Sequence, residues 1–523
     1  MRILFLAAEN GALEGGKVGG IGDVVAQLPP ALARLGCRVV VVTPSHGFLQ
    51  HAAGAQRIGA CRYRFHGIPH TADLYQVPGR PEAPGVRHVV VEHPLLTALD
   101  PAHGRPRIYV HEGPDRPFRI DASRFAHFCA AAVAAAAQGA LGRLDVMHLH
   151  DWHAAPAAVL QRFSADGAGI GGLRTVFTIH NLGLQGIRPL RGDDSSLEAW
   201  FPGLVYDWLS VSDPRWHDCV NLMAAGIRLA DAVHTVSPTY AQEILRPSVP
   251  PAFYGGEGLE GVLGYVHGQG RLTGILNGCD YPEEIPAAGI DWPALVHRFR
   301  ARVLDWGIAG ARASGAHFLA LQRLTDAALR PDPPPLLLTC VGRAVEQKAF
   351  LMCAPGSDGR SGLDAVLADL GDGGQLMLLS AGAPEWEARL LEIAARHDNC
   401  IFLNGYSEAC AEALYAGGDL FLMPNSYEPC GISQMLAMRA GQPCVVHAVG
   451  GLRDTVRDGF DGFAFSGATA TAQVDGFTAA VRRALALRRE QPDRWREIRR
   501  RAAAARFSWN DAARRCIEAL YTP

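Results

Sequence analysis

Short hydrophobic runs alternate with amphipathic stretches over most of the chain. In the first half, strands of the buried type are predicted at residues 2–9, 38–44, 144–150, 174–180 and 231–237. Most of these strands are followed by a stretch with helical periodicity. Runs that are hydrophobic throughout are typical of parallel strands covered on both faces. The first half is therefore predicted to be a doubly wound α/β domain.

The same alternation returns in the second half of the chain. Strands are predicted at residues 336–342, 375–382, 400–406 and 419–424, and a helix at 510–521. Between the two series, residues 330–335 read RPDPPP, which suits a linker because proline interrupts both helices and strands. Residues 247–271 are rich in glycine and are predicted to be irregular, whereas 291–324 are predicted to be helical. Two α/β domains are therefore expected, facing each other across a cleft.

Composition narrows the class of protein. The chain has 523 residues, 48% of them hydrophobic, and a net charge of −3, which gives no electrostatic reason to expect a nucleic-acid or membrane partner. Its twelve cysteines include no CxxC pair, which argues against a zinc knuckle or a redox motif. No signal peptide is evident, and a cytoplasmic protein with reduced thiols is expected.

One stretch, DLFLMPNSYEPCGISQML at residues 419–436, carries the clearest candidate site. A strand is predicted at 419–424, a loop at 425–431 and a helix from Ile432 or Ser433. Glu428, Cys430 and Gly431 then lie at the carboxyl end of a strand, where open α/β sheets bind ligands. Cys430 could suggest a thiol nucleophile, but no catalytic partner is identifiable, and a place in the pocket wall is favoured.

A glycine-rich loop follows the first predicted strand. Gly11, Gly16 and Lys17 fit the start of a phosphate-binding P-loop, but Val18 stands where that motif needs a hydroxyl. A nucleoside triphosphatase is therefore not favoured. A turn of this kind can expose backbone N–H groups to an anion, to which Lys17 adds charge. The alternative is a flexible turn without a ligand.

Polar residues end two further strands of the first half. His148, His150 and His153 lie close in sequence, but they straddle a strand and a turn and no carboxylate pattern completes a metal site, so no metal is expected. Asp151 is predicted to be a strand-end polar residue or a helix N-cap, and His180 ends the next strand in the same way. Two adjacent strands with polar ends favour a ligand site.

Arg343 and Lys348 follow the first strand of the second half. Their spacing allows them to converge on one anion, the arginine as a fork and the lysine as a point charge. The alternative is a pair of solvated charges.

Several motifs together resemble bacterial glycogen synthases and plant starch synthases, which form glycosyltransferase family 5. They occur in family order over nearly the whole chain: KVGGIGDVV (17–25), HDWHA (150–154), FTIHNLGLQG (177–186), ADAVHTVSPTYAQEI (230–244), LNGCD (276–280), GRAVEQK (342–348), NSYEPCGISQ (425–434) and GGLRDTV (450–456).

The resemblance implies a GT-B fold, with an N-terminal Rossmann-like domain at 1–255, a nucleotide-sugar-binding domain at 256–505 and a C-terminal helix at 506–523 that crosses back to the first domain. It implies a retaining glucosyltransferase that moves glucose from ADP-glucose to the non-reducing end of an α-1,4-glucan such as glycogen. Neither a metal nor another cofactor is expected.

The resemblance also implies roles for individual residues. Lys17, with Gly19 and Gly20, would lie near the donor and the acceptor. Arg343 and Lys348 would bind the diphosphate, and Glu428 would hold sugar hydroxyls. The remaining predicted site residues are His180 and Asp151 in the glucosyl pocket, Tyr406 stacked on the nucleobase, and Asp23, Asn277, Cys430, Gly431 and Ser433 as further substrate contacts.

One departure from the family pattern keeps two alternatives open. Residues 349–361 intervene between Lys348 and the Gly362-Leu363-Asp364 triplet that usually follows at once. One alternative is a related retaining GT-B transferase that uses UDP-glucose or a small acceptor. The other is a glucan-binding or regulatory homologue with weakened catalysis, although the joint presence of Lys17, Arg343, Lys348 and Glu428 disfavours it.

Overall fold

The computed structural model of the protein describes residues 1–522, apart from 101–103, 111, 114, 282–290 and 310–313. Contacts within the chain define two compact units. Unit 1 comprises Met1–Ser248, Gly255–Gly278 and Trp509–Pro523. Unit 2 comprises Val249–Tyr254 and Cys279–Ser508. Among the described residues, no helix is long and apolar enough to cross a membrane.

Unit 1 is built on a nine-stranded sheet in the order β11-β10-β7-β6-β1-β2-β5-β4-β3. The strands are β1 (Arg2–Leu6), β2 (Arg38–Pro44), β3 (Gln56–Phe65), β4 (Ile68–Val77), β5 (Val86–Glu92), β6 (Val146–His150), β7 (Arg174–Ile179), β10 (Ala232–Thr235) and β11 (Leu272–Gly274). All neighbours pair in parallel except β3 with β4 and β4 with β5. A separate antiparallel pair joins β8 (Ile187–Pro189) to β9 (Cys219–Asn221).

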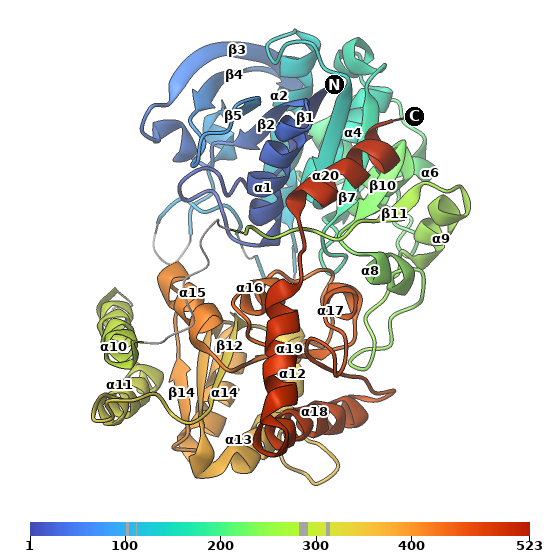
Figure 1. Ribbon diagram of the computed structural model, residues 1–523. Helices are drawn as coiled ribbons and strands as arrows, with labels where there is room; N and C mark the ends of the chain where they lie inside the picture. Colours follow the sequence, from blue (N-terminus) through green and yellow to red (C-terminus); the bar gives the residue numbers. More distant parts are fainter. Residues whose placement is uncertain (101–103, 111, 114, 282–290, 310–313, 523) are drawn as a thin grey trace. The chain divides into compact units, whose positions relative to one another are not determined.

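Alternate residues of β1 reach two different cores because successive strand side chains point to opposite faces. Leu4 and Leu6 belong to the core formed with α2 (Arg119–Ala137). Ile3 and Phe5 belong to the core formed with α1 (Gly20–Arg34) and α20 (Trp509–Cys516), which lie side by side in Figure 1. The other helices of unit 1 are α3 (Asp151–Ala154), α4 (Pro156–Phe163), α5 (Leu197–Trp200), α6 (Trp208–Val211), α7 (Leu222–Leu229), α8 (Pro238–Glu243) and α9 (Glu260–Gly268).

The end of the chain is anchored in unit 1 by polar contacts as well as by this core. The indole Nε1–H of Trp509 donates a hydrogen bond to the side chain of Gln27 on α1. The hydroxyl of Tyr521 lies 2.9 Å from Nδ1 of His148 on β6. The last residues of the sequence therefore complete the unit that the first residues begin.

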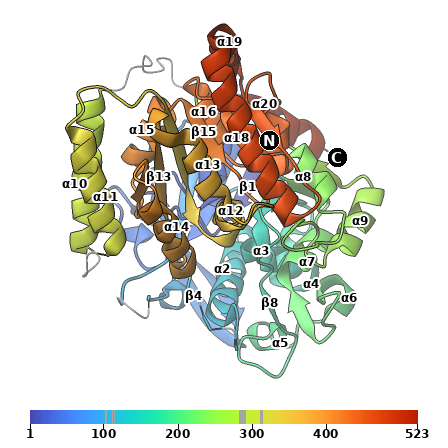
Figure 2. The ribbon, with the colours of Figure 1, turned by 90° about the horizontal axis from the view of Figure 1, so that it is seen from below.

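Unit 2 has six parallel strands in the order β14-β13-β12-β15-β16-β17. The strands are β12 (Leu337–Ala344), β13 (Gln375–Gly382), β14 (Cys400–Leu403), β15 (Leu420–Met423), β16 (Cys444–His447) and β17 (Phe463–Phe465). Numbered along the chain, this is the 3-2-1-4-5-6 order of the Rossmann fold. The helices are α10 (Trp292–Ala309), α11 (Gly315–Ala328), α12 (Glu346–Cys353), α13 (Gly362–Leu370), α14 (Pro384–Arg396), α15 (Glu408–Gly417), α16 (Ser433–Arg439), α17 (Gly450–Thr455), α18 (Ala470–Glu490) and α19 (Pro492–Ala504). Figure 2 shows α10 and α11 packed as a pair.

The structure differs from the sequence expectations in several places, and strands β5 and β17 are among the elements that were not predicted. The β3–β4 hairpin was not predicted, and α9 forms within residues 247–271, which were expected to be irregular. The stretch 291–324 contains parts of two helices, α10 and α11, rather than one, and residues 310–313 between them lie outside the described residues. The predicted domain boundary at 255 falls inside unit 1 because β11 pairs with β10 of that unit.

Candidate active site

Many of the predicted site residues lie near a switch point, where the strand order of the sheet reverses, and each unit has one such point. In unit 2, the strand order reverses between β12 and β15, which are neighbours in the sheet although far apart in sequence. Ligands of open α/β sheets bind beyond the carboxyl ends of the strands at such a point. The loop after β15 contains Glu428, and α12, which follows β12, contains Lys348. The predicted strand, loop and helix at 419–436 are confirmed, with α16 beginning at Ser433.

The Glu428 carboxylate is the centre of the site in unit 2. Its Oε2 accepts hydrogen bonds from Nζ of Lys348 at 3.2 Å and from Nδ2 of Asn425 at 2.6 Å. Glu428 is 8% exposed and the Lys348 side chain 19% exposed. Charges held this far from water interact more strongly than a surface pair. The result is a fixed pair of opposite charges at the switch point.

The loop that carries Glu428 is held from three sides. On α12, the side chain of Gln347 donates to the backbone carbonyl of Tyr427 at 3.0 Å. The backbone carbonyl of Gln347 accepts from the N–H of Ser426 at 2.8 Å. Nδ1 of His447, at the end of β16, lies 3.0 Å from the carbonyl of Asn425. The N–H of Gly451 donates to the carbonyl of Glu428 at 3.1 Å. These contacts fix the direction of the Glu428 side chain before any ligand binds.

The glycine turn at the start of α17 permits this close approach. A Cβ on Gly451 would lie 2.2 Å from the carbonyl oxygen of Cys430, and a Cβ on Gly450 would lie 1.9 Å from that of Glu428. Both distances are far below van der Waals contact. Only glycine at these two positions allows the turn to pack against the loop.

Gly451→Ala is therefore expected to lower the stability of the protein by about 1–3 kcal/mol, because the loop must move to accommodate the methyl group. The shift is measured by thermal unfolding. The matched control is Gly373→Ala, where an added Cβ meets nothing within 4 Å. Equal melting temperatures for the two variants would show that the turn is not tightly packed.

The other predicted residues of unit 2 have different surroundings. Gly431 has a φ of +74°, a conformation that favours glycine. Cys430 is buried, and the hydroxyl of Tyr415 donates to Ser433 Oγ at 2.9 Å. Arg343 is exposed at the end of β12. Tyr406, expected to stack on a nucleobase, is 62% exposed.

In unit 1 the strand order reverses between β1 and β6. The glycine-rich loop leaves β1 there and leads into α1, which begins at Gly20 with Gly19 as its N-cap residue. Oε2 of Glu9 accepts hydrogen bonds from the N–H groups of Val18 and Gly19, each at 2.7 Å. The expectation that the loop offers free N–H groups to an anion is therefore wrong at these two positions, since a carboxylate of the protein already binds them.

Lys17 extends from this loop, and its side chain is 40% exposed. Its Nζ lies 2.5 Å from Oδ1 of Asp23 in the first turn of α1. Oε1 of Glu9 accepts from the hydroxyl of Tyr109 at 2.8 Å. Burial, and next the negative charge of Glu9, raise the pKa of Tyr109 well above its ordinary value, so the hydroxyl stays protonated and acts as a donor. Glu9 thus ties the loop to a second segment of unit 1.

Asp151 and His180 end the adjacent strands β6 and β7, and the structure brings them together as predicted. Oδ1 of Asp151 accepts from the N–H of His180 at 2.7 Å, and Nδ1 of His150 lies 2.9 Å from Nε2 of His180. Asp151 has a φ of +56°, a strained conformation that aspartate and asparagine tolerate better than most residues. Burial lowers the pKa of His180 to about 3 and raises the pKa of Asp151 to about 8.

The raised pKa of Asp151 has a consequence for stability. The folded protein retains the proton up to about pH 8, whereas the unfolded chain loses it near pH 4, so stability falls as the pH rises through this window. Asp151→Asn keeps the oxygen acceptor and removes the titration. The melting temperature of Asp151→Asn, relative to that of the original protein at the same pH, is expected to rise from about pH 5 to about pH 8. Parallel profiles, as expected for the exposed control Asp326→Asn, would contradict this.

His148, His153 and Asn277 are also buried in unit 1. His148 uses both ring nitrogens, toward Tyr521 and at 2.5 Å toward Oγ1 of Thr178. His153 is buried beside Phe125, with ring centroids 4.8 Å apart. Asn277 is buried in the segment after β11.

Sequence reasoning missed Glu9, Tyr109 and Asn425. Glu9 and Asn425 could have been found by the rule already applied to Asp151, because each follows the end of a central strand.

The composition of the chain contains a further signal for the site. Only two of the 49 basic residues Lys and Arg are lysines, and they are Lys17 and Lys348, both predicted site residues. A chain that uses arginine almost everywhere retains a primary amine at two positions where the chemistry differs.

Comparison with known proteins agrees with this architecture. Residues 2–265 match the model of the starch synthase catalytic domain, and residues 362–502 match that of glycosyl transferases group 1. The chain is 38% identical to a glycogen synthase of Anaeromyxobacter sp. (strain Fw109-5), covering 100% of this chain and 99% of the relative. It is 31% identical to a glycogen synthase of Streptococcus equi subsp. zooepidemicus, covering 98% of each.

Among solved structures, the chain is similar to the catalytic domain of starch synthase IV from Arabidopsis thaliana bound to ADP and acarbose. The TM-score is 0.74 at 26% identity, over 99% of this chain and 98% of that one. Two Rossmann-like units in one chain, together with this similarity, define a GT-B glycosyltransferase. Within that class, the matches over the full length of the chain are to glycogen synthases. The chain belongs to the glycogen synthase and starch synthase family.

Proposed function

We propose that this glycogen synthase homologue transfers glucose from ADP-glucose to the non-reducing end of an α-1,4-glucan, with retention of configuration and without a catalytic metal. The observation that carries the proposal is the contact between half-buried Lys348 and buried Glu428 at the switch point of unit 2. The ADP and acarbose bound to the starch synthase IV structure support the choice of an adenine nucleotide and a glucan.

The pair supplies the two kinds of contact that the transfer requires. Cleavage of the bond between glucose and the diphosphate leaves negative charge on the departing group and positive charge on the sugar ring. Lys348, and Arg343 at the end of β12, stabilise the departing diphosphate in place of a metal ion. Glu428, already fixed by Asn425, accepts hydrogen bonds from hydroxyls of the transferred glucose.

Retention of configuration is assigned to attack on the same face from which the diphosphate leaves. The acceptor hydroxyl forms the new bond to the anomeric carbon and passes its proton to an oxygen of the departing phosphate. The state of Asp151 supports this route over a covalent intermediate. Burial raises the pKa of Asp151 to about 8, and a carboxylic acid is a poor nucleophile. A glucosyl adduct trapped on Asp151 or on any other side chain would overturn it.

One assay tests the function. Purified protein is given ADP-glucose or UDP-glucose, with and without glycogen, and both the release of nucleoside diphosphate and the growth of glucan are followed. The expected result is release with ADP-glucose that depends on glycogen. Release with UDP-glucose but not with ADP-glucose, or transfer only to a small acceptor, would indicate a different transferase. Binding without turnover would indicate a glucan-binding or regulatory protein.

A further inference from the structure

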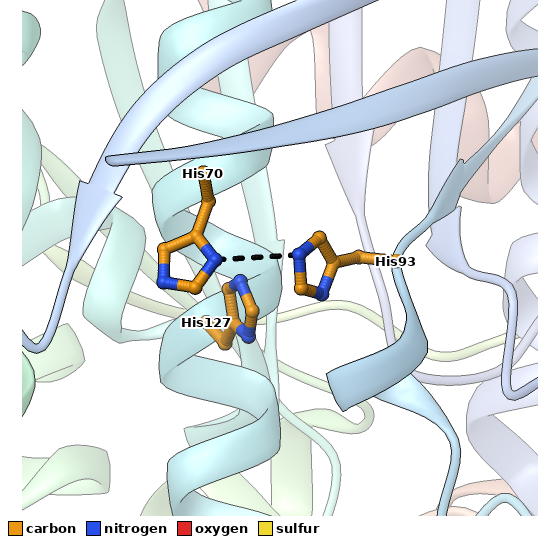
Figure 3. Close-up of side chains that lie close together, drawn as sticks. All are labelled: His70, His93 and His127. Carbon is orange, nitrogen blue, oxygen red and sulfur yellow. Dashed lines mark hydrogen bonds between the residues drawn. The ribbon is translucent and has the colours of Figure 1, made fainter. Parts of the chain in front are cut away.

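Three histidines from separate elements of unit 1 meet away from the residues assigned above. His70 lies on β4, His93 directly follows β5, and His127 lies on α2. Figure 3 shows the three imidazole rings turned toward one another. One ligand nitrogen from each ring lies within 4.8 Å of the others. None of the three was singled out from the sequence, since they are spread over more than fifty residues.

The distances between the nitrogens suit a tetrahedral ion. Nδ1 of His70 and Nε2 of His93 are 3.3 Å apart. Tetrahedral Zn–N bonds of about 2.0–2.1 Å place neighbouring nitrogens about 3.3–3.4 Å apart. The ring centroid of His127 is 4.6 Å from that of His93 and 5.1 Å from that of His70, close enough for small side-chain movements to close a three-nitrogen site.

His127 has the bonding pattern of a ligand that lacks its ion. It is 1% exposed, and its Nε2 lies 2.6 Å from the hydroxyl of Tyr63. Its Nδ1 is buried without a hydrogen-bond partner among the described residues. Histidines that bind a metal through one ring nitrogen almost always use the other for such a hydrogen bond. An unpaired buried nitrogen is otherwise costly, and an ion would satisfy it.

We propose that His70, His93 and His127 bind one zinc ion, which fastens the β4–β5 edge of the sheet to α2. Three imidazoles with a water molecule as the fourth ligand form a known tetrahedral zinc coordination set. The ion takes no part in glucosyl transfer. Its role is structural, because it links three elements that are distant in sequence.

The hydrogen bonding of His93 is compatible with the site. Nδ1 of His93 accepts a hydrogen bond from the N–H of Leu95 at 3.2 Å. Binding through Nε2 moves the proton of His93 to Nδ1 and breaks this bond, and the exposed Leu95 segment can turn its N–H to water.

Zinc content is the direct test. Full-length protein without an affinity tag is incubated with Zn²⁺, dialysed and analysed for metal. One ion per chain is expected, with an X-ray absorption spectrum that shows three nitrogens at about 2.0–2.1 Å, and with a higher melting temperature than the metal-free protein. Less than stoichiometric zinc, or a spectrum dominated by oxygen ligands, would overturn the proposal.

Variants locate the ion. His70 and His93 are half-buried, so alanine at either position is expected to leave the protein folded. His70→Ala and His93→Ala are each expected to abolish the retained zinc and the zinc-dependent rise in melting temperature. Tyr63→Phe keeps the packing and removes only the hydroxyl, and is expected to weaken zinc binding about 10- to 100-fold. The exposed control His267→Ala should bind zinc like the original protein. Unchanged zinc content in folded His70→Ala and His93→Ala, judged by circular dichroism, would place any bound zinc elsewhere and reject the site.

Discussion

Replacement of Lys348 by alanine is expected to lower kcat about a hundredfold, with a much smaller change in KM for the sugar nucleotide. The Lys348 ammonium is held near the carboxyl end of β12 by its contact with Glu428, so it is in place before the donor binds. Charge builds up on the diphosphate mainly as the glycosyl bond breaks. A preformed cation therefore stabilises the transition state more than the bound donor.

The measurement is steady-state release of nucleoside diphosphate with ADP-glucose and glycogen. Arg494→Ala removes an exposed cation of α19 and serves as the control, with no change expected. Lys348→Arg is the more informative companion. It keeps the charge but replaces a compact ammonium by a planar guanidinium, and activity between those of the original protein and Lys348→Ala is expected. A kcat for Lys348→Ala within about twofold of the original would reject the role in leaving-group stabilisation.

Glu428→Gln is expected to lower kcat/KM about 10- to 150-fold, because a charge-assisted hydrogen bond to the sugar is lost. The substitution keeps the shape of the side chain. However, Oε2 of Glu428 accepts from both Lys348 and Asn425, and a neutral amide oxygen in its place holds the Lys348 ammonium less strongly than a carboxylate does. Part of the loss should therefore come from a displaced Lys348.

A double variant separates these two contributions. If Lys348 and Glu428 act as a unit, Lys348→Ala combined with Glu428→Gln should be little worse than the poorer single variant. Multiplication of the two single effects would instead show that they act independently. Glu408→Gln, at an exposed position of α15, is the control for a glutamate-to-glutamine change.

The Lys348 and Glu428 pair also shows how far sequence alone could lead. Strand β15, its loop and α16 were predicted closely, because the strand is uniformly apolar and the glycine at 431 marks the turn. Glu428 and Lys348 were both chosen as site residues. Their contact could not be read from the chain, because it depends on β12 and β15 being neighbours across eighty residues of sequence.

The failures have equally local causes. Strand β3 alternates exposed and buried residues and carries arginines at 57, 62 and 64, so its apolar content is too low to mark a buried strand. Helix α9 contains three glycines and forms because Leu263 and Val266 pack into the core of unit 1, which outweighs its poor helix propensity. The N–H groups of the glycine-rich loop were expected to face an anion, and only its folded path reveals that Glu9 occupies them.

The makeup of unit 1 has a consequence for synthesis of the protein. Its central strand β1 precedes unit 2 in the sequence, but the core on one face of that strand includes Trp509, Leu520 and Tyr521, which follow unit 2. Domains usually fold as units while the chain is being made. Here the whole of unit 2 must be translated before unit 1 can close this core. The nascent first unit therefore waits, with apolar surface uncovered, while unit 2 is translated.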